Sequence, residues 1–315
     1  MNNEDYQPEK VIDFHTHIAS ELFLPPAFNK GTTDNMAVVM ESKGLKPNKE
    51  KISRLQSSTM EDHHCDQMVK EMDEANVDEA VLLLPDFTYA LPGGEMTIKN
   101  MIDHHRQVLE RHPGRFRVFT GVDPRWGKEG LDLFEKAIRD YGFHGLKLYP
   151  PCGYHASEKI LYPFYEICRA FKIPVLMHIG ATSPVLSFSY AQPMYVDDAA
   201  RDFPEVDFVL AHGSVHYQDE CAMLCTNRPN VYLDVSGYAM AEISAMRPLF
   251  QRGIAHKILF GTDWPIFRLQ GKQSDVVGKL HGETEAFPSH MSDDDKDLFF
   301  FKNAERLLGK RLKLS

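Results

Sequence analysis

The chain has 315 residues, of which 43% are hydrophobic and 25% are charged, a composition typical of a soluble globular protein with a large buried core. Its formal net charge of −10 argues against a nucleic-acid partner, because phosphate binding needs a basic surface. No apolar run approaches the roughly 20 residues of a membrane span, and the polar start MNNEDYQPEK lacks the apolar core of a signal peptide, so we expect a cytoplasmic protein with no membrane partner.

Short apolar segments recur along the chain, and each is followed by a stretch with helical apolar spacing. The apolar segments cover residues 11–17, 78–85, 116–124, 144–150, 173–180, 206–213, 230–237 and 257–265. Near-continuous apolar strands that alternate with helices indicate a parallel sheet covered on both faces. Eight such units in one chain predict a single-domain (β/α)₈ TIM barrel over residues 1–315. A doubly wound open sheet is the alternative, but no glycine-rich phosphate loop follows a strand, so we expect no nucleotide cofactor.

Two connections are longer than ordinary loops of such a barrel. They span residues 18–58, after the first strand, and 266–291, after the last. Both leave the C-terminal face, where the active sites of these barrels lie, so we expect 18–58 to be a lid insertion; surface decoration is the alternative. The sequence Thr59-Met60-Glu61-Asp62 resembles a capping box and predicts a helix that runs to Ala75. His63-His64 and His104-His105 are then expected on helix surfaces.

The first strand, VIDFHTH, carries polar residues at every second position. Because strand side chains alternate faces, Asp13, His15 and His17 point the same way, and two imidazoles on one face can share a cation. Polar residues also end or follow four later strands. They are Lys147, His178, His212 and Asp263. Since the C-terminal ends of parallel strands meet at one barrel mouth, the sequence predicts that these side chains converge on a metal site.

The motifs D-F-H-T-H, V-L-M-H-I-G, V-L-A-H-G-S and F-G-T-D-W-P occur in this order. Together they resemble the amidohydrolase superfamily, and more closely its amidohydrolase-related branch, which includes aminocarboxymuconate-semialdehyde decarboxylase. The resemblance covers nearly the whole chain. It implies one divalent metal ion, and the residues it implies as ligands are His15, His17, His178 and Asp263. It further implies a catalytic or second-site role for His212. We expect Asp13 either to accept a hydrogen bond from a ligand imidazole or to fill the bottom layer of the barrel.

Lys147 has three interpretations. In binuclear members of the superfamily a lysine at this position is carboxylated and bridges two metals, whereas the branch that this chain resembles is usually mononuclear. Lys147 could instead bind a substrate carboxylate or form a structural salt bridge. Arg125 and Tyr149 are weaker candidates for substrate binding.

Three imidazoles and one carboxylate favour zinc, and manganese, iron or cobalt would suit the same donors. The predicted function is hydrolysis of a small amide, ester or lactone through metal-activated water, in which Asp263 transfers the proton and His212 steadies the oxyanion. The alternative is metal-dependent decarboxylation of an aromatic or unsaturated carboxylic acid. The predicted partner is a small-molecule substrate, which is anionic in the second case. Barrels of this type commonly form homo-oligomers, but the sequence shows no interface signal.

Overall fold

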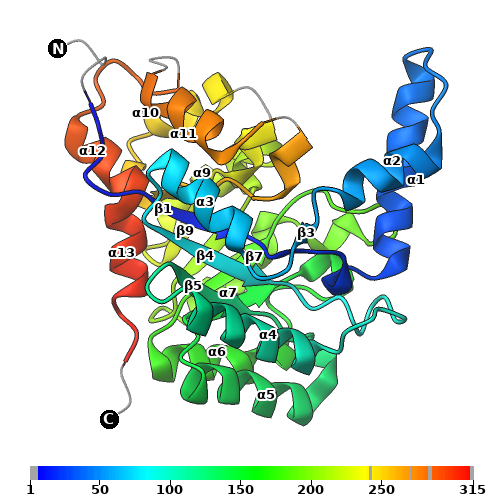
Figure 1. Cartoon of the computed structure of the whole chain (residues 1–315). Helices are drawn as coiled ribbons and strands as arrows, with labels where there is room; N and C mark the ends of the chain where they lie inside the picture. The colour runs from blue at the N-terminus through cyan, green and yellow to red at the C-terminus, as the bar shows by residue number, and fades with distance from the viewer. Residues whose placement is uncertain (1–5, 241–242, 270, 283–285, 313–315) are drawn as a thin grey trace.

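The computed structural model describes residues 6–240, 243–269, 271–282 and 286–312. Its centre is an eight-stranded parallel sheet in the order β1-β4-β5-β6-β7-β8-β9-β10 (Figure 1). The strands are β1 (Ile12–Thr16), β4 (Glu79–Leu84), β5 (Phe116–Thr120), β6 (Gly145–Leu148), β7 (Val175–His178), β8 (Phe208–Ala211), β9 (Val231–Asp234) and β10 (Ile258–Leu259). They are buried almost throughout because helices cover the outer face and side chains fill the interior. The predicted barrel is confirmed.

The last strand returns to the first and closes the barrel. The backbone N–H of Phe14 donates to the carbonyl of Phe260 at 2.9 Å, and the N–H of Asp263 donates to the carbonyl of His15 at 2.8 Å. A parallel bridge joins Thr16 to Trp264. This closure places the residues after β10 directly beside the His-x-His motif.

Helices between the strands surround the barrel (Figure 1). They include α3 (Asp66–Ala75), α4 (Ile98–Arg111), α5 (Gly127–Asp140), α6 (Tyr162–Phe171), α7 (Asp197–Asp202), α8 (Gly213–His216), α9 (Gln218–Asn227) and α10 (Arg247–Gln251). In α4, for example, the Thr97 side chain accepts a hydrogen bond from the Asn100 N–H, and Met101, Ile102 and Val108 lie on the buried face. His105 lies on this buried face as well, so its predicted place on the helix surface is wrong; its ring bonds to the Met101 carbonyl one turn earlier. The buried apolar side chains on the inner faces of these helices thus form the outer layer of the core.

The chain after β10 also contributes helices. They are α11 (Gln273–Gly282), α12 (Asp293–Asp297), a π-helical turn (Leu298–Lys302) and α13 (Asn303–Leu308). The first of these, α11, packs against α3. Within the described part of the chain, none of the helices combines the length and hydropathy needed to cross a membrane.

The prediction that a helix begins at Thr59 is wrong. Glu61–Asp62 form a short strand, β3, which pairs antiparallel with β2 (Ala19–Ser20). Helix α3 begins only at Asp66, and the Asp62 carboxylate accepts hydrogen bonds from the backbone N–H groups of Gln67 and Met68. His63 and His64 consequently lie in the turn between β3 and α3, and not in a helix.

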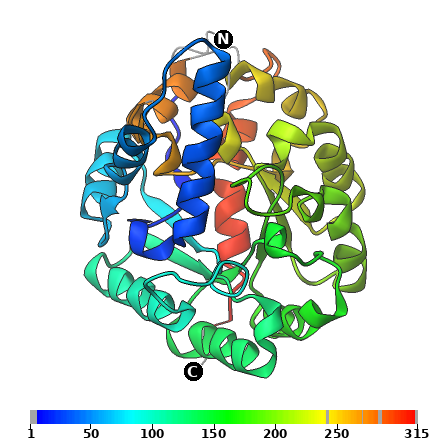
Figure 2. The same ribbon diagram turned by 90° about the vertical axis from the view of Figure 1, so that its right-hand side faces the viewer.

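Between β2 and β3 the chain forms two helices, α1 (Pro26–Ser42) and α2 (Lys49–Ser57), which pack against each other. Figure 2 shows α1 crossing the end of the barrel. Its start is held there because the Ser183 hydroxyl donates to the Phe28 carbonyl at 3.0 Å and the Phe28 ring lies 4.9 Å from the Phe87 ring. Ser183 follows β7 and Phe87 follows β4, so α1 lies over the C-terminal ends of the strands.

Candidate functional site

The residues predicted at the strand ends meet at one end of the barrel. His15 Nε2 lies 3.5 Å from Asp263 Oδ1, and His17 Nε2 lies 3.3 Å from the same oxygen. The His212 ring centre is 4.3 Å from that of His15 and 4.9 Å from that of His178. Five side chains from four strand ends therefore share one small volume beneath α1.

The hydrogen bonds around His15 and His17 fix which nitrogen carries the proton. His17 Nδ1 donates to the Leu83 carbonyl at 2.7 Å, and His15 Nδ1 donates to Asp234 Oδ2 at 2.9 Å. Since carbonyl and carboxylate oxygens only accept, each neutral imidazole has its proton on Nδ1 and a lone pair on Nε2. His15 Nε2 is buried and has no hydrogen-bond partner within the described part of the chain.

Three lone-pair atoms thus face one another: two Nε2 atoms and Asp263 Oδ1. A tetrahedral ion with bonds of about 2.1 Å separates its ligand atoms by about 3.4 Å. The 3.3 Å and 3.5 Å separations at Asp263 match that spacing. The donor set and its geometry therefore fit a divalent cation.

Backbone conformation directs two of these side chains into the mouth. His212 has φ 53° and Asp263 has φ 60°, so both occupy the left-handed region, which non-glycine residues seldom adopt. Such conformations persist where surrounding contacts hold them, and they concentrate at functional sites. The Asp263 N–H is held by its hydrogen bond to His15, which links this backbone turn directly to the metal-ligand motif.

Burial sets the protonation states of the cluster. It lowers the pKa of His15, His178 and His212 well below the usual histidine value, so these rings are neutral, the form that binds metal. Burial raises the pKa of Asp263, and the nearby His17 and Lys147 oppose that rise. The carboxylate is therefore a stronger base than an exposed aspartate.

Lys147 points into the same cluster. It is 1% exposed, and its Nζ atom has no hydrogen-bond partner among the described residues. Burial lowers its pKa to about 8, with Asp234 and Asp263 acting in the opposite direction. A structural salt bridge, one of the three interpretations, does not account for an ammonium group without a direct partner.

Tyr149 and His178 form a stacked pair beside the cluster, with ring centres 4.2 Å apart. The Tyr149 hydroxyl pairs with Thr182 Oγ1 at 2.5 Å, and His178 Nε2 lies 3.2 Å from the Ala181 carbonyl. Arg125, by contrast, forms two hydrogen bonds to the Asp123 carboxylate. Because that pairing uses the guanidinium, Lys147 and not Arg125 is the cation that faces the histidines.

Of the two alternatives for Asp13, the described residues favour a place in the packed interior of the barrel over a hydrogen bond from a ligand imidazole. Its carboxylate accepts hydrogen bonds from Thr262 Oγ1 at 2.5 Å, from Gln273 Nε2 at 2.7 Å and from the Thr262 and His15 N–H groups. Burial raises the pKa of Asp13 to about 7. Asp234 takes the expected role instead. Its sequence signal was the acid that ends the apolar run N-V-Y-L-D, in the same position as the other strand-end residues.

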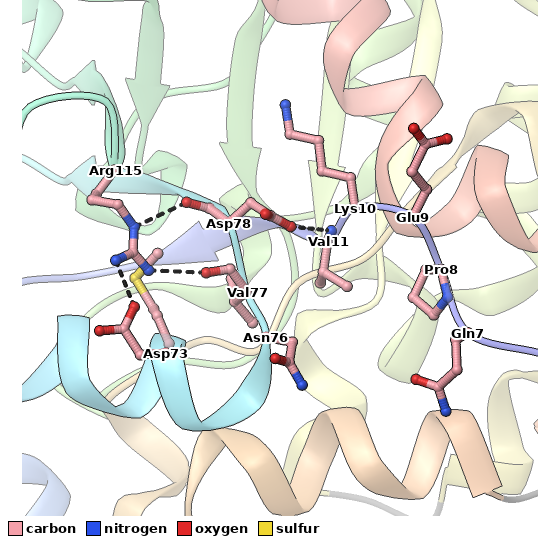
Figure 3. Close-up of a pocket in the computed structure, with 11 residues that line it drawn as sticks. Gln7, Pro8, Glu9, Lys10, Val11, Asp73, Asn76, Val77, Asp78 and Arg115 are labelled. Atoms are coloured by element: carbon pink, nitrogen blue, oxygen red, sulfur yellow. Dashed lines mark hydrogen bonds and ion pairs between the residues drawn. The ribbon is translucent and has the colours of Figure 1, made fainter.

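A cavity of about 650 Å³ lies at the opposite end of the barrel, next to the N-terminal ends of β1, β4 and β5 (Figure 3). Three of its charged residues are engaged with each other or with the backbone, and Lys10 pairs with Glu79 and Glu305. Arg115 pairs with Asp73 at 2.6 Å and donates to the carbonyls of Val77 and Asp78, and Asp78 accepts from the Val11 N–H. The C-terminal end therefore holds the better candidate for catalysis.

A family model described as amidohydrolase matches residues 12–310. A match to the protein fluG of Emericella nidulans, 28% identical over 99 residues, covers 30% of this chain and only 11% of that protein. Among solved structures, an uncharacterised TIM-barrel protein of Bordetella bronchiseptica has a TM-score of 0.69 and 22% identity over 96% of this chain and 99% of the other. A dihydroxybenzoic acid decarboxylase of Polaromonas sp. JS666, solved with manganese and 2-nitroresorcinol, has a TM-score of 0.64 and 19% identity over 95% and 97%.

Proposed function

The chain belongs to this amidohydrolase family, and from that premise we propose that it is a metal-dependent hydrolase that cleaves a small amide, ester or lactone. The observation that carries the proposal is the convergence of His15 Nε2, His17 Nε2 and Asp263 Oδ1 at the separations of a metal-ligand set. Buried lone pairs that face one another without a proton between them are unfavourable unless a cation joins them.

His15, His17, His178 and Asp263 would hold the ion. Three imidazoles and a carboxylate favour zinc, and manganese, which the Polaromonas structure contains, suits the same donors. When bound, a divalent ion supplies Lewis acidity, which polarises a carbonyl group and lowers the pKa of water. Everything else in the reaction falls to the side chains around it.

Asp263 is suited to carry the proton. One of its oxygens faces the two imidazole nitrogens, so the other can take a proton from the attacking water and deliver it to the leaving group. The raised pKa of its carboxyl strengthens Asp263 as the base that takes the proton from the attacking water. Lys147, which is buried and has no hydrogen-bond partner in the described ranges, would bind a negative charge on the substrate or on the developing oxyanion.

We also propose that residues 18–58 act as the lid of this site. A series of aromatic rings connects α1 to a proposed ligand: Phe28 lies 4.9 Å from Phe87, Phe87 lies 4.8 Å from Tyr149, and Tyr149 stacks on His178 at 4.2 Å. His178 is only 6% exposed under this cover. Displacement of α1 would open the mouth, and its return would exclude water from the reacting groups.

Lys147 favours a second candidate function, decarboxylation of an aromatic or unsaturated carboxylic acid. An unpaired ammonium group inside a metal cluster suits a substrate carboxylate, and the similar Polaromonas protein is a decarboxylase. In that reaction Asp263 would protonate the carbon that loses carbon dioxide.

A substrate screen separates the two. The purified protein, loaded with zinc or manganese, is offered lactones, esters, amides and aromatic carboxylates while acid release and carbon dioxide release are followed separately. We expect hydrolysis that is lost with a chelator and restored by the divalent ion. Carbon dioxide release without hydrolysis would replace the first function by the second, and turnover that persists without metal would contradict both.

A further inference from the structure

We infer that Asp234 and Ser236 form a positioning pair that fixes His15 and His212 in the same tautomer, with both Nε2 atoms proton-free toward the centre. Asp234 ends β9, and Ser236 begins the 3₁₀-helix that follows (Ser236–Met240), where its hydroxyl donates back to the Asp234 carboxylate. The tautomers follow from contacts within the chain alone. Their effect on turnover rests on the proposed function.

One carboxylate contacts both histidines, directly at one oxygen and through a hydroxyl at the other. Asp234 Oδ2 lies 2.9 Å from His15 Nδ1, Asp234 Oδ1 lies 2.5 Å from Ser236 Oγ, and Ser236 Oγ lies 2.7 Å from His212 Nδ1. Asp234 and Ser236 are both 0% exposed. The backbone N–H groups of Ser236 and His212 also donate to Asp234 Oδ1, at 3.1 Å and 3.3 Å, and hold the carboxylate in place.

The proton positions follow from the number of donors. A carboxylate can only accept, so Ser236 must give its single hydroxyl proton to Asp234 Oδ1. The serine oxygen is then an acceptor, and the atom that can donate to it at 2.7 Å is His212 Nδ1. Ser236 Oγ also lies 3.2 Å from His15 Nδ1, but that proton is directed to Asp234 at the shorter distance of 2.9 Å. Both rings therefore carry the proton on Nδ1.

This arrangement changes the role of His212. A neutral His212 with a lone pair on Nε2 can accept a proton or bind a cation, but it cannot donate to an oxyanion. The hydrolytic mechanism predicted from the sequence has His212 steady the oxyanion, and the hydrogen bonds favour proton acceptance instead. The same carboxylate orients a proposed metal ligand and this base, whose ring centres are 4.3 Å apart. Partners of this kind typically change metal affinity or activity about 10–100-fold when they are replaced.

Ser236→Ala tests the pair, because it removes the contact to His212 and leaves the Asp234–His15 hydrogen bond in place. Full-length protein with ¹⁵N-labelled histidine is compared with and without zinc by long-range ¹H–¹⁵N spectra, and the two rings are assigned through His15→Gln and His212→Gln. We expect His212 to lose its Nδ1–H signature in Ser236→Ala while His15 keeps its own. Ser289→Ala, at an exposed serine, should leave both signatures unchanged.

Kinetic and metal-binding measurements on the same samples complete the test. We expect kcat to fall about 10–100-fold in Ser236→Ala at an unchanged KM and zinc content, whereas Asp234→Asn should weaken zinc binding by about the same factor. Ser236→Cys, nearly isosteric, is a second variant if alanine impairs folding, and it should change the His212 spectrum in the same direction. A His212 signature that is identical in wild type and both variants would overturn the inference. A changed signature in a protein without hydrolytic activity would contradict the proposed function and leave the tautomer assignment intact.

Discussion

Replacement of Lys147 by methionine is expected to stabilise the metal-free protein and to abolish its activity. The lysine is 1% exposed and no described residue forms a hydrogen bond with its Nζ atom, so the fold bears the cost of a buried charge. Methionine has a similar length and no charge, and its flexible thioether fills irregular space well. The substitution therefore removes the charge and largely preserves the packing.

The size of the effect follows from the pKa of Lys147, which burial lowers from 10.5 to about 8. Because the unfolded chain binds this proton more tightly, the penalty is full below about pH 8 and disappears as the pH rises through 10.5. At about 1.36 kcal/mol for each pH unit between the two values, wild type loses about 3 kcal/mol of stability at pH 7. At pH 9.5 the same calculation gives a remaining stability penalty of about 1.4 kcal/mol.

Urea unfolding of the metal-free proteins at pH 7 and pH 9.5 measures this difference. We expect the free energy of unfolding of Lys147→Met to exceed that of wild type by about 3 kcal/mol at pH 7 and by roughly half of that at pH 9.5. The control Lys99→Met, at an exposed site, should stay within about 0.5 kcal/mol of wild type at both pH values. A variant that is less stable than wild type at pH 7 would show that Lys147 has a stabilising partner and would refute the reasoning. Higher stability without activity would be the usual exchange of stability for function at a catalytic site.

Three further predictions concern the ligands and the barrel. Asp263→Asn should retain part of its metal and lose about 10²–10⁴-fold in turnover, mainly in kcat; near-normal kcat in a metal-replete sample would remove Asp263 from proton transfer. His178→Ala should sharply lower the amount of bound metal found by elemental analysis, whereas His290→Ala, at an exposed position, should leave it unchanged. Equal losses of metal in the two variants would contradict the ligand assignment. In Gly121→Ala the new Cβ would lie 2.6 Å from a carbonyl oxygen of the neighbouring strand, so urea unfolding should show that the variant is less stable by at least about 1–3 kcal/mol. Gly278→Ala, where no described atom lies within 4 Å of the new Cβ, should leave the stability unchanged or raise it.

The barrel and the strand-end residues could be predicted because both follow from local features. Alternation within a strand shows which residues share a face, and parallel strands bring their C-terminal ends to one mouth. His15 and Asp263 lie at opposite ends of the sequence, yet they meet because barrel closure makes β1 and β10 neighbours. The same local reasoning could not determine where the helix after Thr59 begins. The competing partner of Glu61–Asp62 is Ala19–Ser20, and no local signal marks that pairing.

The helices of residues 18–58 also gave little sequence signal. The buried residues of α1 are Gly31, Thr33 and Ala37, which are small or polar, so no large apolar stripe marks the helix. Gly31 allows a close approach here, because a Cβ at this position would lie 2.7 Å from the Val185 side chain. Close contact between α1 and the loop after β7 is therefore achieved by small residues, and hydrophobic periodicity cannot detect it.

The missed residue, Asp234, shows where the partner of a ligand imidazole should be sought. The two nitrogens of an imidazole point in different directions, so a ring that turns Nε2 toward the cavity turns Nδ1 away from it. Asp13 shares the face of His15, but two residues of strand place it about 7 Å deeper, at the level of Thr262 and Gln273, whose donors it accepts. A carboxylate that ends another strand lies at the level of the ring itself, and Asp234 is 2.9 Å from it. An acid at the C-terminal end of another barrel strand is thus a better candidate for orienting a ligand histidine than an acid two residues earlier on the same strand.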